Sequence, residues 1–439
     1  MSQQREDSRP RPDQGEVREL VEHLFRHKAG QMVATLTRLF GVDNLELAED
    51  AVHETLLKAL RLWPYRGVPD NPGGWLLQVA RNHALDVLRR EAGLRRKSQR
   101  SEGHPEPAPA AEMALALDDP LGDDQLTMMF LCCHPALSRE AQVALTLKTV
   151  GGFGTPEIAR AFLLSETTVA QRLVRAKRRL REQRLPFALP PPGELPARLD
   201  AVLAVLYLLF NEGYNASQGD ALVRRELCAE AIRLGTLLAG HPVGDRPKVH
   251  ALLALMSLHA SRLPARLDAD GNLLSLAAQE RSRWDREAIA RGLGHLERAG
   301  VGAELSSYHL EAGIAACHAV AASDERTDWE AILFYYDEMA ARSSSPVVLL
   351  NRAVAVAMAK GIPAGLQALD EIKDRPELRR YYLLPATLGE LYERSGQPDL
   401  AVRCYRDALA LATNGTEQRF LQGKLARIDA SFVLPSTTP

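Results

Sequence analysis

Two helical patterns separated by a short turn constrain the middle of the chain more than any other feature. Residues 155–162 form the first pattern, and residues 163–165 form the turn. Residues 166–180 form the second, because apolar side chains recur there at helical spacing. This arrangement predicts a helix-turn-helix. The predicted buried stripe of its second helix consists of Val169, Leu173, Ala176 and Leu180.

The opposite face of the second helix carries hydrogen-bonding side chains first and cationic side chains after them. In a recognition helix, the first group meets base edges in the major groove and the second meets phosphates. Residues 160–184 contain eight basic and two acidic residues. A helical hairpin with a solvated basic face is the alternative. The predicted DNA-facing side chains of this face are Thr167, Thr168, Gln171, Arg172, Arg175, Arg178 and Arg179.

Overall charge excludes a uniformly basic nucleic-acid binder. The chain has 54 Lys and Arg against 56 Asp and Glu, so it is nearly neutral. A second basic block, residues 81–100, holds seven basic and two acidic residues. Two concentrated basic stretches in a nearly neutral chain favour polyanion binding at defined places.

The composition predicts an all-α protein of several domains. The 439 residues suggest about three domains, and β-branched runs are scarce. Proline-rich stretches separate the helical segments and predict linkers. The predicted divisions are a helical bundle at 17–92, a flexible linker at 93–122, the helix-turn-helix domain at 123–184, a proline-rich linker at 185–197 and a helical extension at 198–430.

The N-terminal helices carry a resemblance to a known family. Residues 45–62 and 75–91 read as helices, separated by a stretch rich in Pro and Gly. The segments Ala48–Ala59 and Trp75–Arg90 resemble region 2 of extracytoplasmic-function (ECF) sigma factors, and the helix-turn-helix resembles region 4 of that family. The resemblance implies a factor that binds core RNA polymerase, through its β′ and β subunits, and recognises promoter DNA.

The resemblance also assigns residues of the first helix to polymerase binding. Asp50 and Glu54 lie one turn apart, so their carboxylates share a face. In the family, this helix docks on the clamp helices of the β′ subunit. Gln usually stands where this chain has His53. The alternative is an ordinary solvated acidic face. The implied polymerase-binding set is Asp50, His53, Glu54 and Lys58.

The second helix and the loop before it are implied to read the −10 element. Asn82 falls on the family position that helps read a flipped base, and its amide can both donate and accept. The loop at 66–74 is implied to line the pocket, whereas Trp75 is predicted to be core. Besides Asn82, the −10 set comprises Arg66, Arg81, Arg89 and Arg90. In region 4, the matching positions imply that Thr168, Gln171 and Arg175 read the −35 element, with Arg172 and Lys177 on the backbone.

The last hundred residues predict paired helices. Residues 378–396 and 399–413 form one pair, in which Leu388, Gly389, Tyr392, Ala401 and Tyr405 match the tetratricopeptide pattern. The segment is similar to the C-terminal extension of one ECF subgroup. We expect these repeats to bind a protein partner or to fold back on the DNA-binding halves.

Neither of two metal-like motifs predicts a metal site. Cys132, Cys133 and His134 lie among apolar residues, which favours a packed helix. Residues 268–272 resemble the start of a calcium loop, but Gly271 comes two residues early, so a turn is predicted. The charged segment Gln279–Arg286, which surrounds Trp284, receives no function.

Enzyme chemistry and a membrane location are not expected. The chain shows no phosphate-binding glycine loop and no catalytic triad, so neither catalysis nor a cofactor is predicted. No apolar run reaches bilayer length, and residues 1–14 lack the apolar core of a signal peptide. Five cysteines without C-x-x-C spacing suit the cytoplasm.

These observations predict an alternative sigma factor whose C-terminal extension regulates its activity in cis. Two rivals stay open. One is a helix-turn-helix regulator with a repeat domain that does not bind core polymerase. The other is a repeat scaffold whose N-terminal half is degenerate.

Overall fold

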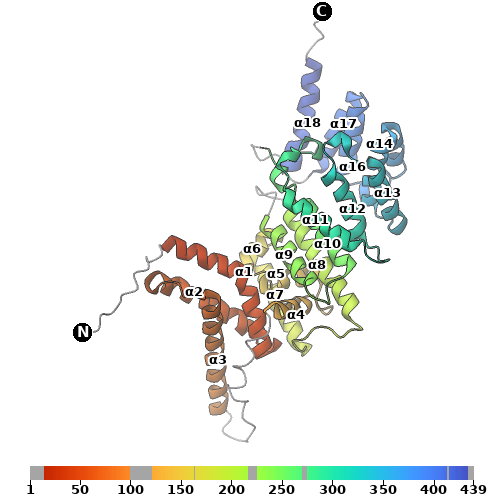
Figure 1. Ribbon diagram of the computed structural model, residues 1–439. Helices are drawn as coiled ribbons and strands as arrows, with labels where there is room; N and C mark the ends of the chain where they lie inside the picture. Colours follow the sequence, from red (N-terminus) through yellow and green to blue (C-terminus); the bar gives the residue numbers. More distant parts are fainter. Residues whose placement is uncertain are drawn as a thin grey trace, which may run out of the picture. The chain divides into compact units, whose positions relative to one another are not determined.

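The computed structural model describes residues 14–98, 121–162, 164–215, 225–268, 274–412 and 415–433. Within these ranges the regular elements are α-helices and short 3-10 helices, without a β-strand, which confirms the all-α prediction (Figure 1). Residues 99–120 of the predicted first linker and residues 269–272 of the predicted turn lie outside the described residues. The chain divides into two compact units, residues 1–208 and residues 209–439.

Unit 1 contains two groups of helices. In the first group, α1 lies against α2, and α2 lies against α3. In the second, α5 and α6 both lie against α7, and α4 lies against α5. The elements are α1 (Gln14–Phe40), η1 (Val42–Asn44), α2 (Leu45–Arg66), α3 (Pro72–Ser98), α4 (Leu121–Cys132), α5 (Arg139–Thr149), α6 (Thr155–Phe162), α7 (Glu166–Glu182) and the start of α8 (Leu195–Asn215).

The first two predicted helices are longer than expected. α2 continues through Pro64 to Arg66, and α3 begins at Pro72 rather than at Trp75. Proline suits the first helical position because its missing N–H would have no partner there. The Asn71 side chain accepts a hydrogen bond from the Gly74 N–H at 2.9 Å, which satisfies one free donor of the first turn. The end of the expected loop is therefore helical.

The cysteine pair at the end of α4 is packed in the core, as predicted. Cys132 and Cys133 are both fully buried, and the Cys132 sulfur lies 3.0 Å from the Thr149 hydroxyl. Burial raises the pKa of the Cys133 thiol to about 12 and also raises that of Cys132, so both thiols stay protonated at neutral pH. Within the described ranges, no group of three His, Cys, Asp or Glu side chains is arranged to hold a metal ion.

Unit 2 is a succession of helices in which each helix lies beside the next. α10 lies against α9, α11 and α12, while α13 lies against α12 and α14. The helices are α9 (Arg225–Ala239), α10 (Pro247–Ala260), α11 (Arg286–Ala299), α12 (Ser307–Val320), α13 (Trp329–Arg342), α14 (Pro346–Lys360), α15 (Ile362–Asp370), α16 (Leu383–Arg394), α17 (Pro398–Leu411) and α18 (Gly415–Val433). Short 3-10 helices are η3 (Leu263–Ala265), η4 (Leu276–Ala278), η5 (Arg281–Arg283), η6 (Asp324–Arg326) and η7 (Pro376–Leu378).

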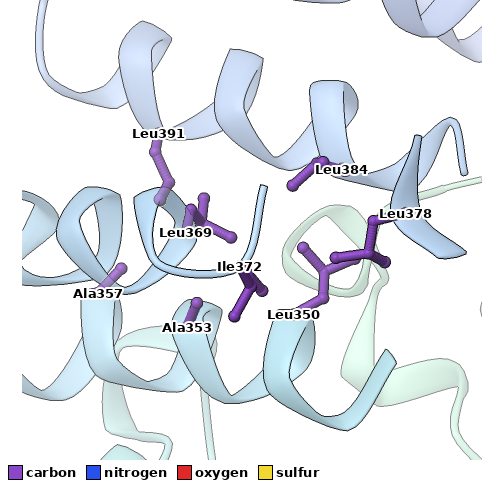
Figure 2. Packing of buried hydrophobic residues seen from close by; sticks show 8 residues of the cluster. All are labelled: Leu350, Ala353, Ala357, Leu369, Ile372, Leu378, Leu384 and Leu391. Atoms are coloured by element: carbon purple, nitrogen blue, oxygen red, sulfur yellow. The ribbon is translucent and has the colours of Figure 1, made fainter. Parts of the chain in front are cut away.

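A leucine-rich cluster holds α14, α15 and α16 together (Figure 2). Gly365 lets α15 approach α14, because a Cβ at that position would lie 2.3 Å from the Ala357 Cβ. Burying each leucine contributes roughly 1.5–3 kcal/mol, so this cluster is a main source of stability here. Its members are Leu350, Ala353, Ala357, Leu369, Ile372, Leu378, Leu384 and Leu391.

The predicted pair of helices after residue 378 is present with a later start. Residues 376–378 form η7, and the first helix of the pair, α16, begins at Leu383. Gly389 faces Tyr405 so closely that an added Cβ would lie 2.8 Å from the ring. Ala401 and Tyr405 are both buried. The small Gly389 of α16 and the large Tyr405 of α17 therefore pack against each other, and the identity of the repeat stays a prediction. No helix in the described part of the chain is long and apolar enough to cross a membrane.

Candidate nucleic-acid and polymerase interface

Helix α7, the predicted recognition helix, forms because its N-cap, its buried apolar stripe and its charged exposed face all favour a helix over the same residues. The Ser165 hydroxyl accepts a hydrogen bond from the Thr168 N–H at 3.1 Å, which caps the first turn. The predicted stripe, Val169, Leu173, Ala176 and Leu180, is buried. The opposite face is exposed at Thr167, Thr168, Gln171 and Arg175, and Arg172 is partly exposed. This face can meet the edges of base pairs.

Lys177 does not share that exposed face. Its ammonium group forms an ion pair with the Glu49 carboxylate of α2, and only 12% of the Lys177 side chain is exposed. Burial raises the pKa of Glu49, and the charge of Lys177 opposes that rise. One turn later, Arg181 lies 3.2 Å from the Glu46 carboxylate. The end of α7 is thus docked on α2, and in this arrangement Lys177 is not free to contact DNA.

The polymerase-facing set predicted on α2 lies on one exposed face. Asp50, His53, Glu54 and Lys58 are all exposed, whereas Ala51, Val52, Thr55, Leu56 and Ala59 of the same helix are buried. Positions separated by three, four and eight residues lie on one side of a helix, which explains the segregation. The result is a mixed, mainly acidic face available for a partner.

The predicted −10 set on α3 is divided by burial. Asn82 is exposed, and its side-chain oxygen accepts a hydrogen bond from Gln78 Nε2 at 3.1 Å. Arg89 and Arg90 are also exposed, and Arg89 lies 3.7 Å from Asp86. Arg81 is different, because it is only 9% exposed. The structure therefore groups Asn82 with Arg89 and Arg90 on the surface but places Arg81 in the interior.

Arg66 is exposed at the last residue of α2, beside the loop that enters α3. Gly67 follows it with φ +80°, a backbone conformation that favours glycine. Trp63 is 1% exposed, and its ring centroid lies 5.5 Å from that of Trp75, which is partly buried. Trp75 is thus half-buried against the buried Trp63, which is less than the full burial of a core residue that the sequence predicted.

A second contact between the two helical groups of unit 1 was not predicted from the sequence. Asp124 of α4 is buried. It accepts a hydrogen bond from the Thr35 hydroxyl at 2.9 Å and forms an ion pair with Arg38 of α1, whose Nε lies 2.8 Å away. On α1, a Cβ at Gly30 would lie 2.0 Å from the Val150 carbonyl oxygen, which follows α5. A glycine within a long helix and a buried aspartate are the sequence signals of this contact, but neither identifies its partner.

Both helical groups of unit 1 match known protein families. Residues 24–93 match sigma-70 region 2, and residues 127–180 match sigma-70 region 4. Residues 198–300 match a family of unknown function, DUF6596.

An uncharacterized protein of Rhizobium meliloti (strain 1021) is 37% identical to this chain over 407 residues, which cover 91% of this chain and 94% of that protein. No solved structure matches this chain. Each sigma-70 match includes the helices that carry the predicted DNA-facing or polymerase-facing residues. The chain therefore belongs to the family of the Rhizobium protein, and its sigma-70 regions 2 and 4 support an RNA polymerase sigma factor for promoter-specific transcription.

Proposed function

We propose that the chain is an alternative sigma factor of the ECF type that acts in the bacterial cytoplasm. Region 2 binds the β′ clamp helices of core polymerase through Asp50, His53, Glu54 and Lys58, and the factor also contacts the β subunit. The observation that carries this proposal is the segregation of α2, which buries its apolar side and exposes this set.

The proposed DNA contacts also rest on which side chains of each helix are exposed. Asn82 reads the −10 element, and Arg66, Arg89 and Arg90 hold the adjacent phosphates. Thr167, Thr168, Gln171 and Arg175 read the −35 element, with Arg172 on the backbone. Their support is exposure on the free faces of α3 and α7. Cationic and amide side chains are the groups that pair with phosphates and base edges.

Promoter binding requires region 4 to leave region 2. The two promoter elements lie about 25 base pairs apart, which is roughly 85 Å along a duplex that rises 3.4 Å per pair. In this structure the C-terminal end of α7 is paired directly with α2 through Lys177 and Arg181. One factor cannot hold that contact and reach both elements. The predicted backbone contact of Lys177 therefore belongs to an open form.

Transcription in vitro tests the proposal. The purified chain is mixed with bacterial core polymerase and genomic DNA fragments, and the transcript starts are mapped. Discrete starts that share two upstream elements support it. Asn82→Ala should abolish those starts without weakening core binding, whereas a double Asp50→Ala, Glu54→Ala variant should weaken core binding itself. Retained DNA binding without core binding would instead favour a helix-turn-helix regulator.

We further propose that the C-terminal extension, with its repeat-like helices, regulates this activity in cis or through a protein partner. The extension should be removed after residue 208, because the start of α8 is bound to region 4. Arg198 donates to the Phe130 carbonyl at 2.8 Å, and Arg139 donates to the Ala201 carbonyl at 2.9 Å. If a truncated chain with native helical content transcribes at the full-length rate, regulation in cis is wrong.

A further inference from the structure

Unit 2 gathers cationic and aromatic side chains around the end of α10. The Asp285 N–H donates to the Ser261 carbonyl at 2.9 Å, which holds η5 beside the residues that follow α10. We call the resulting group the arginine cluster. It consists of Tyr214, His259, Arg262, Arg266, Arg281, Trp284 and His318.

Tyr214 organises one side of the arginine cluster. The Arg266 guanidinium stacks on its ring, with Cζ 3.9 Å from the centroid, and also donates to its backbone carbonyl. Arg262 donates to the Tyr214 hydroxyl and lies 3.2 Å from His259 Nδ1. Two guanidinium groups are therefore fixed beside one phenol ring.

Arg281 organises the other side. Its Nη1 donates to the carbonyls of His318, at 2.6 Å, and Ala321, at 3.1 Å. Its Cζ lies 4.7 Å from the Trp284 ring, and its Nη2 lies 3.7 Å from the Asp324 carboxylate. Only 12% of the Arg281 side chain is exposed, so the orientation of this guanidinium is fixed by these contacts.

Several buried polar atoms of the arginine cluster have no hydrogen-bond partner among the described residues. These atoms are Arg262 Nε, Arg281 Nη2, Trp284 Nε1 and His318 Nδ1. Trp284 is only 3% exposed. The Asp324 carboxylate is 3.7 Å from Arg281 Nη2, which is too far for a hydrogen bond. Buried polar groups in folded proteins almost always have partners, so these four atoms indicate a missing acceptor.

The two histidines of the arginine cluster, His259 and His318, lie near the positive charges of its arginines. Burial, together with the charges of Arg262 and Arg281, lowers the pKa of His318 to about 4. Burial likewise lowers the pKa of His259, together with Arg262, Arg266 and His318. Both imidazoles are neutral at pH 7, and an anion placed here would be attracted by the arginines.

We propose that the arginine cluster binds the oxyanion of a small molecule, a phosphate or a carboxylate, through Arg262, Arg281 and the Trp284 indole N–H. Oxyanions supply acceptors only, and guanidinium donors match them in geometry. The ligand is a small molecule because Trp284 and Arg281 lie below the surface, where the backbone of a duplex cannot reach. This site is separate from promoter recognition, and its test needs no polymerase.

The experiment measures thermal unfolding and tryptophan fluorescence of the full chain during titration with sodium phosphate or sodium citrate. Sodium chloride at equal ionic strength is the reference. Arg281→Lys keeps the charge but removes the forked donors, and Trp284→Phe keeps an aromatic ring but removes the indole N–H with part of the ring volume. Arg291→Lys is the matched control, because Arg291 is an exposed arginine that lies 3.6 Å from Glu287 on its own helix.

Phosphate or citrate should raise the unfolding temperature beyond the effect of chloride. The apparent affinity should fall about tenfold or more in Arg281→Lys and measurably in Trp284→Phe, with no change in Arg291→Lys. A response to phosphate alone identifies a phosphorylated ligand, and a response to citrate alone identifies a carboxylate. The proposal is overturned if neither anion exceeds chloride, or if all four proteins respond alike. Native helical content of each variant, by circular dichroism, keeps the comparison valid.

Discussion

The arginines of α7 and those of the arginine cluster have the same chemistry but opposite environments. Arg178 and Arg179 keep 71% and 54% of their side chains exposed, and their carboxylate partner, Glu182, lies on the same helix. Arg266 is 9% exposed, and its guanidinium is stacked on Tyr214. Exposed arginines remain available to a polyanion, whereas buried arginines must be held by neighbouring groups or by a ligand.

The largest effect is expected from removing a buried arginine of unit 2. Arg266→Ala leaves the Tyr214 carbonyl without its donor and removes the stacked cation. We expect a loss of about 3 kcal/mol in the free energy of unfolding, from an unpaired buried group and a desolvated cation–π contact. Denaturant titration measures it, with Arg291→Ala as the exposed control. Equal small losses in both variants would remove the distinction between the two environments.

Acid should weaken unit 2 through its buried histidines. His318 has an ordinary pKa of 6.5 and a folded pKa of about 4, because burial and then Arg262 and Arg281 disfavour its charged form. A lowered pKa means that stability is complete above pH 6.5 and is lost as the pH falls toward 4. At 1.36 kcal/mol per pKa unit, the loss is roughly 3 kcal/mol.

His318→Gln tests this pH dependence, because glutamine cannot take up the proton. The free energy of unfolding of the variant should fall less between pH 7 and pH 4.5 than that of the unsubstituted chain. His259 shifts in the same direction, so a residual slope is expected. Parallel pH profiles for the two proteins would show that His318 does not contribute.

A surface arginine should affect DNA binding rather than stability. Arg175 is exposed on the reading face of α7. We expect Arg175→Ala to change the free energy of unfolding by less than about 0.5 kcal/mol. The same change should weaken binding to the −35 element by about 1–3 kcal/mol. Footprinting on a mapped promoter measures the second effect, and a variant that binds normally would exclude Arg175 from the interface.

The two ion pairs between α7 and α2 should differ in strength, with the more exposed pair contributing little. Arg181 and Glu46 are each about half exposed, so Arg181→Ala should cost at most about 1 kcal/mol. Lys177→Ala leaves Glu49 without its cation in a site where Glu49 is 11% exposed, so its cost should be larger. Energy transfer between labels on the two helical groups reports the opening, and greater opening in Arg181→Ala than in Lys177→Ala would contradict this order.

Local sequence determined the helices and much of the candidate site. The stripe from Val169 to Leu180 is buried as the spacing predicts, and the acidic face from Asp50 to Lys58 is exposed as its register predicts. Helical periodicity fixes which residues share a side, and apolar stripes must be buried. Exposure of Asn82, Thr168, Gln171 and Arg175 follows from the same rule. Their predicted contacts with DNA stay predictions.

Tertiary packing alone decided the remaining features. Arg81 belongs to a basic block, but the packing of α3 leaves it 9% exposed. Lys177 lies in the predicted DNA-facing series, yet its partner is Glu49, 128 residues away in the chain. In the sequence, the segment Gln279–Arg286 is a run of charged residues around Trp284. In the structure, the residues after α10 and the end of α12 place Arg262 and His318 near Arg281. Periodicity carries no information about pairs so distant in the chain, because the contact depends on how separate helices pack.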